Sequence, residues 1–184
     1  MIETDRFLLR DYRAVDEAAF ISYQTDPAFA IHHLPAELGE DHARSVFHLF
    51  IQWRHAVPRI NYQLAICRKG DGELIGSCGV RMERQLVGEG IFGIELARPY
   101  WGRHGYALEV SVAMIDWAFA ILPVQTLLAD TATSNAIVAR LAEKAGFKRT
   151  QLAEKQWWRL SGGDWLRAKN ARHRTAAALP PRVS

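Results

Sequence analysis

The feature that most constrains the fold is a strand, a glycine-containing turn and a helix, which the sequence predicts in that order across residues 90–121. Apolar residues alternate with other residues along residues 91–96, and a period of two is typical of a strand with one apolar face. Pro99 ends the strand, because proline cannot donate a hydrogen bond to a neighbouring strand. Apolar residues then recur every three or four positions along residues 110–121, which predicts a helix with one buried stripe.

The turn between the strand and the helix has the features of an anion site. Gly102 and Gly105 flank Arg103 and His104 just before the helix. The first backbone N–H groups of a helix have no intrahelical partner, and the aligned peptide dipoles place partial positive charge beside them. We therefore expect a pyrophosphate over residues 102–107, although an ordinary strand-to-helix connection with two glycines fits the same spacing. The turn is not a P-loop, because no Gly-Lys-Ser/Thr follows it.

Three segments of the chain resemble one family. Residues 100–109 read Tyr-Trp-Gly-Arg-His-Gly-Tyr-Ala-Leu-Glu, which resembles motif A of the GNAT superfamily of acetyl-CoA-dependent N-acetyltransferases. In particular, the run resembles the branch that acetylates the N-termini of ribosomal proteins. Residues 2–10 are similar to the first strand of that branch, and Asn135 followed by Gly146-Phe147 is similar to its fourth helix and the next strand. The resemblance covers about residues 2–170.

The resemblance implies a set of residues that contact acetyl-CoA, and two departures from the family pattern. His104 is one residue more than the common turn, so we expect a wider pyrophosphate loop. Val138 stands where the branch often has serine, so a serine proton donor is absent from that position. The residues expected to bind the cofactor are Leu96, Ala97, Arg98, Gly102, Arg103, His104, Gly105, Tyr106, Ala107 and Asn135.

The implied fold class is α/β, with a mixed, mostly antiparallel sheet of about six to seven strands and helices on both faces. The patterns agree, because the first half of the chain is hairpin-like whereas strands and helices alternate in the second half. Strands are expected at residues 6–11, 62–68, 73–82, 90–96 and 123–130, and helices at 14–23, 40–53, 106–121 and 135–144. A final hairpin is expected from Phe147–Trp158 and Asp164–Ala168, turning at Ser161-Gly162-Gly163.

Length and composition bound the remaining possibilities. With 184 residues, 49% of them hydrophobic, we expect one domain over residues 1–170 and a disordered tail over residues 171–184. The net charge of +3 is weak evidence for a nucleic-acid partner, because 20 acidic residues are interspersed. No signal peptide or membrane-spanning run is visible, and Cys67 and Cys78 form no Cys-x-x-Cys, so we expect a cytoplasmic protein.

Two residues are the catalytic candidates. Glu95 lies on the polar side of the predicted strand, so we expect it to act as general base, although a solvated or salt-bridged carboxylate fits the same pattern. Glu89 is on the same side but about 20 Å away at strand rise, and is the weaker candidate. Asn135, by resemblance, would bind the pantetheine arm or orient the thiol, and it would also serve as a helix cap. The histidines lack the spacing of a metal site, so no metal is expected.

The expected reaction is direct transfer of an acetyl group from acetyl-CoA to a primary amine in a ternary complex. Neutralising an α-amine at pH 7 costs about 1 kcal/mol, whereas a lysine costs roughly 4.5 kcal/mol, which favours a protein or peptide N-terminus as acceptor. A small-molecule amine (polyamine, aminoglycoside or amino-acid analogue) is the alternative, and a non-catalytic acyl-CoA-binding module is the other class. The acceptor pocket is expected from residues 29–38, residues 85–89 and the final hairpin, in a monomer or homodimer.

Overall fold

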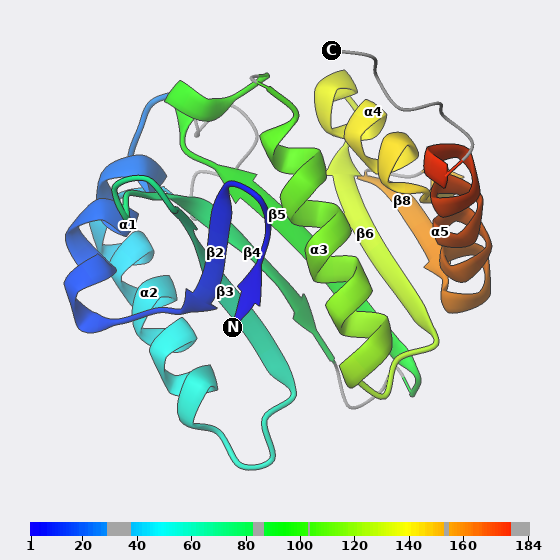
Figure 1. The fold of residues 1–184 in the computed structure, drawn as a ribbon. Helices are drawn as coiled ribbons and strands as arrows, with labels where there is room; N and C mark the ends of the chain where they lie inside the picture. Colours follow the sequence, from blue (N-terminus) through cyan, green and yellow to red (C-terminus); the bar gives the residue numbers. More distant parts are fainter. Residues whose placement is uncertain (29–37, 83–86, 103, 153–154, 178–184) are drawn as a thin grey trace.

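The structure is a computed structural model, and it describes residues 1–28, 38–82, 87–102, 104–152 and 155–177. One eight-stranded sheet has the order β1-β2-β3-β4-β5-β6-β8-β7 (Figure 1). The strands are β1 (Ile2–Glu3), β2 (Phe7–Asp11), β3 (Asn61–Arg68), β4 (Leu74–Arg81), β5 (Glu89–Leu96), β6 (Thr126–Ala132), β7 (Lys148–Leu152) and β8 (Lys155–Ser161). The helices are α1 (Glu17–Gln24), α2 (Glu40–His55), α3 (Tyr106–Ile121), α4 (Ala136–Ala145) and α5 (Gly162–Ala177), with short 3-10 turns at Ala14–Asp16 and Arg98–Tyr100.

The predicted mixed and mostly antiparallel sheet is confirmed. Neighbouring strands run antiparallel except β5 and β6, which run parallel. The strand count differs from the expected six to seven, because residues 147–158 contain both β7 and most of β8 and because Ile2–Glu3 adds a short edge strand.

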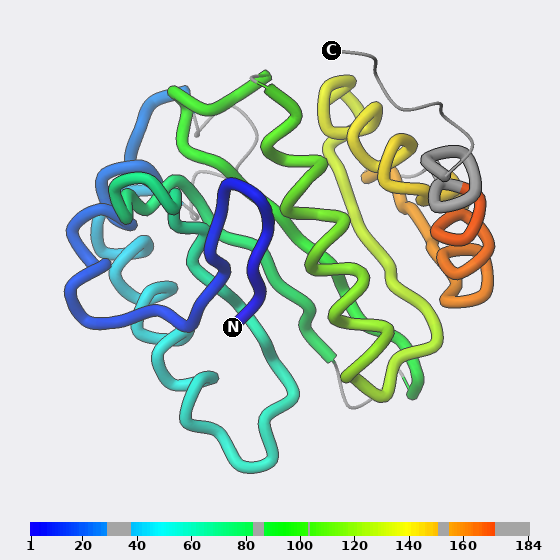
Figure 2. Tube along the Cα trace, viewed as in Figure 1, coloured from blue at the N-terminus to red at the C-terminus, as the bar shows by residue number. Residues whose placement is uncertain are grey.

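Helices cover both faces of the sheet, as the sequence predicts. One face is packed against α3, α4 and α5, through a core that includes Val110, Met114 and Trp165. The other face is packed against α1 and α2, through a second core that includes Tyr12 and Phe47. In Figure 2, α1 and α2 (blue and cyan) lie at the left, and α3, α4 and α5 (green to red) lie at the centre and right. Alternation along β3 supplies both cores, since Leu64 and Ile66 belong to the first and Ala65 and Cys67 to the second.

The predicted final hairpin is wrong in its second half. Residues 164–168 are helical and belong to α5. Ser161 Oγ accepts a hydrogen bond from the backbone N–H of Asp164 at 3.1 Å, and donates to the Asp164 carboxylate. Ser161-Gly-Gly-Asp is therefore a helix cap of the Ser-x-x-Asp kind and not a hairpin turn. The actual hairpin joins β7 to β8.

The last helix extends toward the end of the chain. α5 is assigned as far as Ala177, within the segment for which the sequence suggests a disordered tail. Residues 178–184 lie outside the described part of the chain. Trp165 and Lys169 both hydrogen-bond the Asp116 carboxylate, and these contacts fix α5 against α3.

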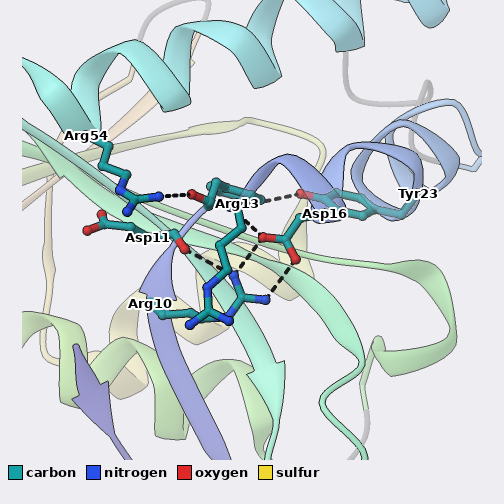
Figure 3. Close-up of polar contacts among 7 residues, drawn as sticks. Arg10, Asp11, Arg13, Asp16, Tyr23 and Arg54 are labelled. Atoms are coloured by element: carbon teal, nitrogen blue, oxygen red, sulfur yellow. Dashed lines mark hydrogen bonds and ion pairs between the residues drawn. The ribbon is translucent and has the colours of Figure 1, made fainter.

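A buried ion pair fixes the start of α1. Arg10 on β2 donates two hydrogen bonds to the Asp16 carboxylate, at 2.7 and 2.8 Å (Figure 3). The backbone N–H of Arg13 donates a further bond to the same carboxylate. Burial raises the pKa of Asp16, but these hydrogen bonds outweigh it and hold the pKa below the ordinary value. The pair therefore sets where α1, and with it Tyr23, lies over the sheet.

We predict that Arg10→Ala lowers the free energy of unfolding by about 3 kcal/mol, because Asp16 is left buried without its partner. Equilibrium denaturation in urea measures the change. Arg44→Ala is the matched control, because Arg44 pairs with Glu17 and Glu40 at the exposed surface, where ion pairs contribute little. Equal losses in the two variants would contradict this role for Arg10.

Candidate active site

The site begins where β5 and β6 separate. These parallel strands pair only over Glu89–Ile91 and Thr126–Leu128. β5 then stays with β4 as far as Leu96, whereas β6 stays with β8 as far as Ala132. The sheet therefore opens into a gap between the two inner strands beyond Ile91 and Leu128. Backbone groups on the inner edges of the gap have no strand beside them and can bind a ligand that carries amide groups.

A cavity of about 120 Å³ lies at the closed end of this gap. β5 contributes Phe92, Gly93 and Ile94, and β4 contributes Arg81. The remaining lining residues come from β6, α3, α4 and the second residue after α4, and they are Ala129, Asp130, Thr131, Ser111, Val138, Leu141, Ala142, Ala145 and Phe147. Most of these side chains are apolar, so the cavity suits a short apolar group that carries a few polar atoms.

Glu95 on β5 lies two residues from Gly93, on the side of the sheet that α1 covers. Its Oε1 accepts hydrogen bonds from the Tyr23 hydroxyl at 2.9 Å and from Gln24 Nε2 at 2.6 Å. Burial raises the pKa of Glu95 to about 7, and hydrogen bonds from Tyr23, Ser77 and Gln24, together with the charge of Arg81, hold the pKa from rising further. Glu95 is thus a partly buried carboxylate that can take up a proton near neutral pH.

Tyr23 is itself part of a buried chain of hydroxyl groups. The hydroxyls of Tyr12 and Tyr23 are 3.5 Å apart, and both rings are almost completely buried. Burial, and the charge of Glu95, raise the pKa of each tyrosine well above its ordinary value. Both tyrosines therefore stay protonated, and Tyr23 remains a hydrogen-bond donor to Glu95.

The turn before α3 has an unusual backbone. Gly102, His104 and Gly105 all have positive φ values, of 65°, 46° and 70°. Glycine adopts this region readily, but His104 does so at a cost. Gly105 is the N-cap of α3, so the free N–H groups of the first helical turn follow directly after it. The additional residue relative to the family pattern is thus accommodated by a third left-handed position.

Arg6 and Glu109 hold this turn from the other end of the chain. Arg6 Nε donates to Glu109 Oε2 at 2.6 Å, and an Arg6 Nη donates to the carbonyl of His104 at 2.8 Å. The backbone N–H of Arg6 adds a bond to Glu109 Oε1, and the Arg6 guanidinium lies 4.5 Å from the centre of the Tyr106 ring. Residues about 100 positions apart therefore fix the strained turn and the first turn of α3.

The other residues expected at the cofactor site lie around the same gap. Leu96 ends β5 and Ala97 follows it, and the Leu96 carbonyl accepts a hydrogen bond from the indole N–H of Trp101. Arg98 is exposed and lies 3.9 Å from Asp26. Asn135 caps α4, since its side-chain oxygen accepts from the backbone N–H of Val138 at 3.1 Å.

Part of the expected site lies outside the described residues. Arg103 is one such residue, and so are residues 29–37 and 85–86 of the segments expected to form the acceptor pocket. Glu89, the weaker candidate for general base, forms an ion pair with Arg159 at 3.0 Å.

Sequence reasoning did not identify several residues that the structure brings to the site. Tyr23 and Gln24 come from α1, Arg6 precedes β2, and Ser111 lies inside α3. No local sequence pattern points to these side chains. They are brought together by packing between elements distant in sequence.

Among the described residues, no group of three or more histidine, cysteine, aspartate or glutamate side chains could hold a metal ion. No helix in the described part of the chain is both long enough and apolar enough to cross a membrane.

Comparison with known proteins identifies the family. Residues 6–148 match the model of the acetyltransferase (GNAT) domain. The chain is 28% identical over 150 residues to the uncharacterized N-acetyltransferase YoaA of Bacillus subtilis (strain 168), covering 81% of this chain and 83% of that protein. The chain therefore belongs to the GNAT acetyltransferases and is an acetyl-CoA-dependent N-acetyltransferase.

Two solved structures confirm the fold. The spermidine N-acetyltransferase from Vibrio cholerae, in complex with CoA and spermine, superposes with a TM-score of 0.74 at 15% identity, over 89% of this chain and 99% of that chain. The ribosomal-protein-S5-alanine acetyltransferase from Vibrio fischeri superposes with a TM-score of 0.71 at 17% identity, over 89% and 97%. The two neighbours are named for different acceptors, so they leave the acceptor class of this chain open.

We predict that Arg6→Ala raises the KM for acetyl-CoA about fivefold with little change in kcat, because a partly exposed ion pair no longer holds the turn before α3. Steady-state kinetics with varied acetyl-CoA measures both constants. Lys69→Ala is the control, since Lys69 pairs weakly with Glu3 nearby and makes no contact with the turn among those observed. A fall in kcat alone would contradict this role.

We also predict a pH-dependent stability effect of Glu95→Gln. The folded-state pKa of about 7 lies above the ordinary value, so the native state loses stability as pH rises through this range and Glu95 becomes charged. The neutral glutamine removes this loss. The difference in Tm between Glu95→Gln and the native chain should therefore shift in favour of the variant as pH rises from 5 to 8. Calorimetry measures this difference, and Glu89→Gln is the control. A difference in Tm that is independent of pH would contradict the raised pKa.

Proposed function

We propose that this chain acetylates the α-amino group of a protein or peptide N-terminus, by direct attack of the amine on acetyl-CoA in a ternary complex. The observation that supports the proposal most is the carboxylate of Glu95, which has a pKa of about 7. Glu95 follows Ile94 of the cavity lining on β5, and its side chain lies on the α1 side of the sheet. A base of this pKa is well matched to an α-amine with a pKa near 8.

The acceptor approaches from the side of the sheet that bears Glu95. Gly93 faces the same side, since it is two residues from Glu95, and a Cβ placed on Gly93 would meet no other atom within 4 Å. Open space beside Gly93 gives an amine a route to the cavity within reach of the carboxylate.

The donor lies along the gap between the strands. The diphosphate binds the backbone N–H groups of residues 102–107, and the amide groups of the pantetheine arm pair with the inner edges of β5 and β6. Leu96, Ala97 and Arg98 flank this path. The amide nitrogen of Asn135 faces the arm while its oxygen caps α4.

The chemical step needs few groups. The amine nitrogen attacks the thioester carbonyl carbon, and a nitrogen–carbon bond forms as the carbon–sulfur bond breaks. Glu95 takes the proton that the amine loses. The CoA thiolate leaves, and with a pKa near 8.5 it needs no dedicated acid because solvent can supply its proton. Tyr23 and Gln24 act as positioning residues, since both donate hydrogen bonds to Oε1 of Glu95.

A small-molecule amine is the second candidate acceptor. The superposition with an enzyme that is named for spermidine and was solved with spermine favours it. The pKa of Glu95 favours the N-terminal amine instead, because an amine with a lysine-like pKa is costlier to neutralise. The free and buried state of Cys67 and Cys78 supports a cytoplasmic location, where ribosomal-protein N-termini would also be found.

We predict that Glu95→Gln lowers kcat/KM about 100-fold and removes an acidic limb of the pH profile centred near pH 7, because the amine loses its proton acceptor. Thiol release from acetyl-CoA measures both effects. Glu89→Gln is the matched control and should keep the native profile. An unchanged pH profile in Glu95→Gln would exclude Glu95 as the base.

The acceptor class is tested with three matched substrates. Peptides with a free N-terminal serine or alanine should release thiol, whereas the same peptides with a blocked N-terminus and an internal lysine should release little. Spermidine is the third substrate. Turnover with spermidine alone would favour the small-molecule reading, and CoA binding without turnover of any amine would favour a non-catalytic module.

A further inference from the structure

One buried hydroxyl group among the described residues has no hydrogen-bond partner within the protein. Ser111 on α3 has no exposed surface, and within the described residues its Oγ is the buried side-chain polar atom that lacks a hydrogen-bond partner. A serine inside a helix commonly bonds back to the carbonyl four residues earlier, and buried polar atoms are nearly always paired. The Ser111 hydroxyl is therefore available to a ligand.

Ser111 lines the cavity at the closed end of the β5–β6 gap. Of the other polar side chains in the lining, Arg81 is exposed, and two are already engaged. Thr131 Oγ1 accepts a hydrogen bond from the indole N–H of Trp158, and Asp130 forms an ion pair with Lys155. Ser111 is thus the buried donor that an entering group would meet.

The cavity is larger than an acetyl group needs. Its volume of about 120 Å³ compares with an apolar cavity of about 150 Å³ that holds benzene. Beyond the carbonyl, an acetyl group has one methyl. The side chains of Phe92, Val138, Leu141 and Phe147 give the space an apolar lining that suits a chain of several carbons.

The position of the cavity relative to Glu95 indicates which part of the donor enters it. Gly93 lies two residues from Glu95, which is about 7 Å along the strand, toward the point where β5 and β6 pair. A thioester carbonyl beside Glu95 would therefore direct its acyl chain into the cavity. α3 and α4 lie next to each other over this part of the sheet, and they close the cavity on their side (Figure 1).

We propose that this cavity is an acyl pocket that accepts three- and four-carbon acyl groups as well as acetyl, and that Ser111 Oγ donates a hydrogen bond to the thioester carbonyl oxygen. The inference rests on the donor site of the proposed function and on the position of Glu95 beside the reacting carbonyl, but not on the identity of the acceptor or on proton transfer to Glu95. Acyl transfer follows the same steps as acetyl transfer. The amine nitrogen bonds to the acyl carbon and loses a proton, the carbon–sulfur bond breaks, and CoA leaves as a thiolate that solvent protonates.

The first test is calorimetric binding of CoA, acetyl-CoA, propionyl-CoA and butyryl-CoA, without an acceptor. Each added methylene should tighten binding about fourfold, as expected for its transfer from water into an apolar pocket. Affinity that is flat or falls with chain length would overturn the pocket. Chain-length dependence without acetylation of any amine would support the pocket and refute the proposed function, so the two failures are distinguishable.

Ser111→Ala tests the hydrogen bond. The affinity for acetyl-CoA should fall about fivefold, whereas the affinity for CoA, which has no acyl carbonyl, should not change. The Tm of the ligand-free protein should not fall, because the hydroxyl has no partner to lose. An equal loss for CoA and acetyl-CoA would overturn the contact with the carbonyl.

Val138→Phe tests the volume, since Val138 lines the cavity from α4 and is partly exposed, so the helix can accept a larger side chain. Binding of butyryl-CoA relative to acetyl-CoA should fall at least about tenfold. Ile137→Phe is the matched control, because Ile137 is 71% exposed and does not line the cavity. Ala142→Val, a smaller change on the cavity wall, should give the same trend. If both cavity variants keep the native preference for longer acyl chains, the proposal is overturned.

Discussion

The candidate site depends on the short stretch over which β5 and β6 pair. Three residues of each strand join the two halves of the sheet, and beyond them each strand follows its outer neighbour, β4 or β8. The gap that results exposes backbone donors and acceptors in the interior, where they need partners. In the proposed binding mode, the amide groups of the pantetheine arm provide those partners, and the turn before α3 binds the diphosphate at the open end of the gap.

The two helical layers give the two sides of the gap different roles. α1 and α2 bury Tyr12 and Tyr23, and through Tyr23 and Gln24 they surround the Glu95 carboxylate with hydrogen-bond donors in a poorly hydrated place. Burial and hydrogen bonding act in opposite directions on its pKa, and burial outweighs the bonds. The native fold therefore keeps a carboxylate that is less stable when charged than it would be in water, a cost that function can explain.

Local sequence predicts the elements well and the contacts between them poorly. The strand, turn and helix of residues 90–121 follow from local periodicity and from glycine, and the model of the family confirms the resemblance that those residues suggest. Ser161-Gly-Gly-Asp was ambiguous, because the same residues suit a hairpin turn and a helix cap, and only packing of α5 against α3 decides between them. The role of Arg6 could not be predicted, because its partners lie about 100 residues away in the sequence. That of Ser111 could not be predicted either, because its hydroxyl has no hydrogen-bond partner within the protein that a local pattern could mark.

In the proposed binding mode, the donor fills the gap from the turn before α3 to the closed end between β5 and β6. Hydrogen–deuterium exchange with and without CoA tests it most directly, because backbone amides that bind the ligand exchange more slowly. The account predicts slower exchange at residues 104–108 and along residues 92–96 and 129–131, with little change in α2. Protection confined to α1 and α2, with none at those three segments, would contradict it.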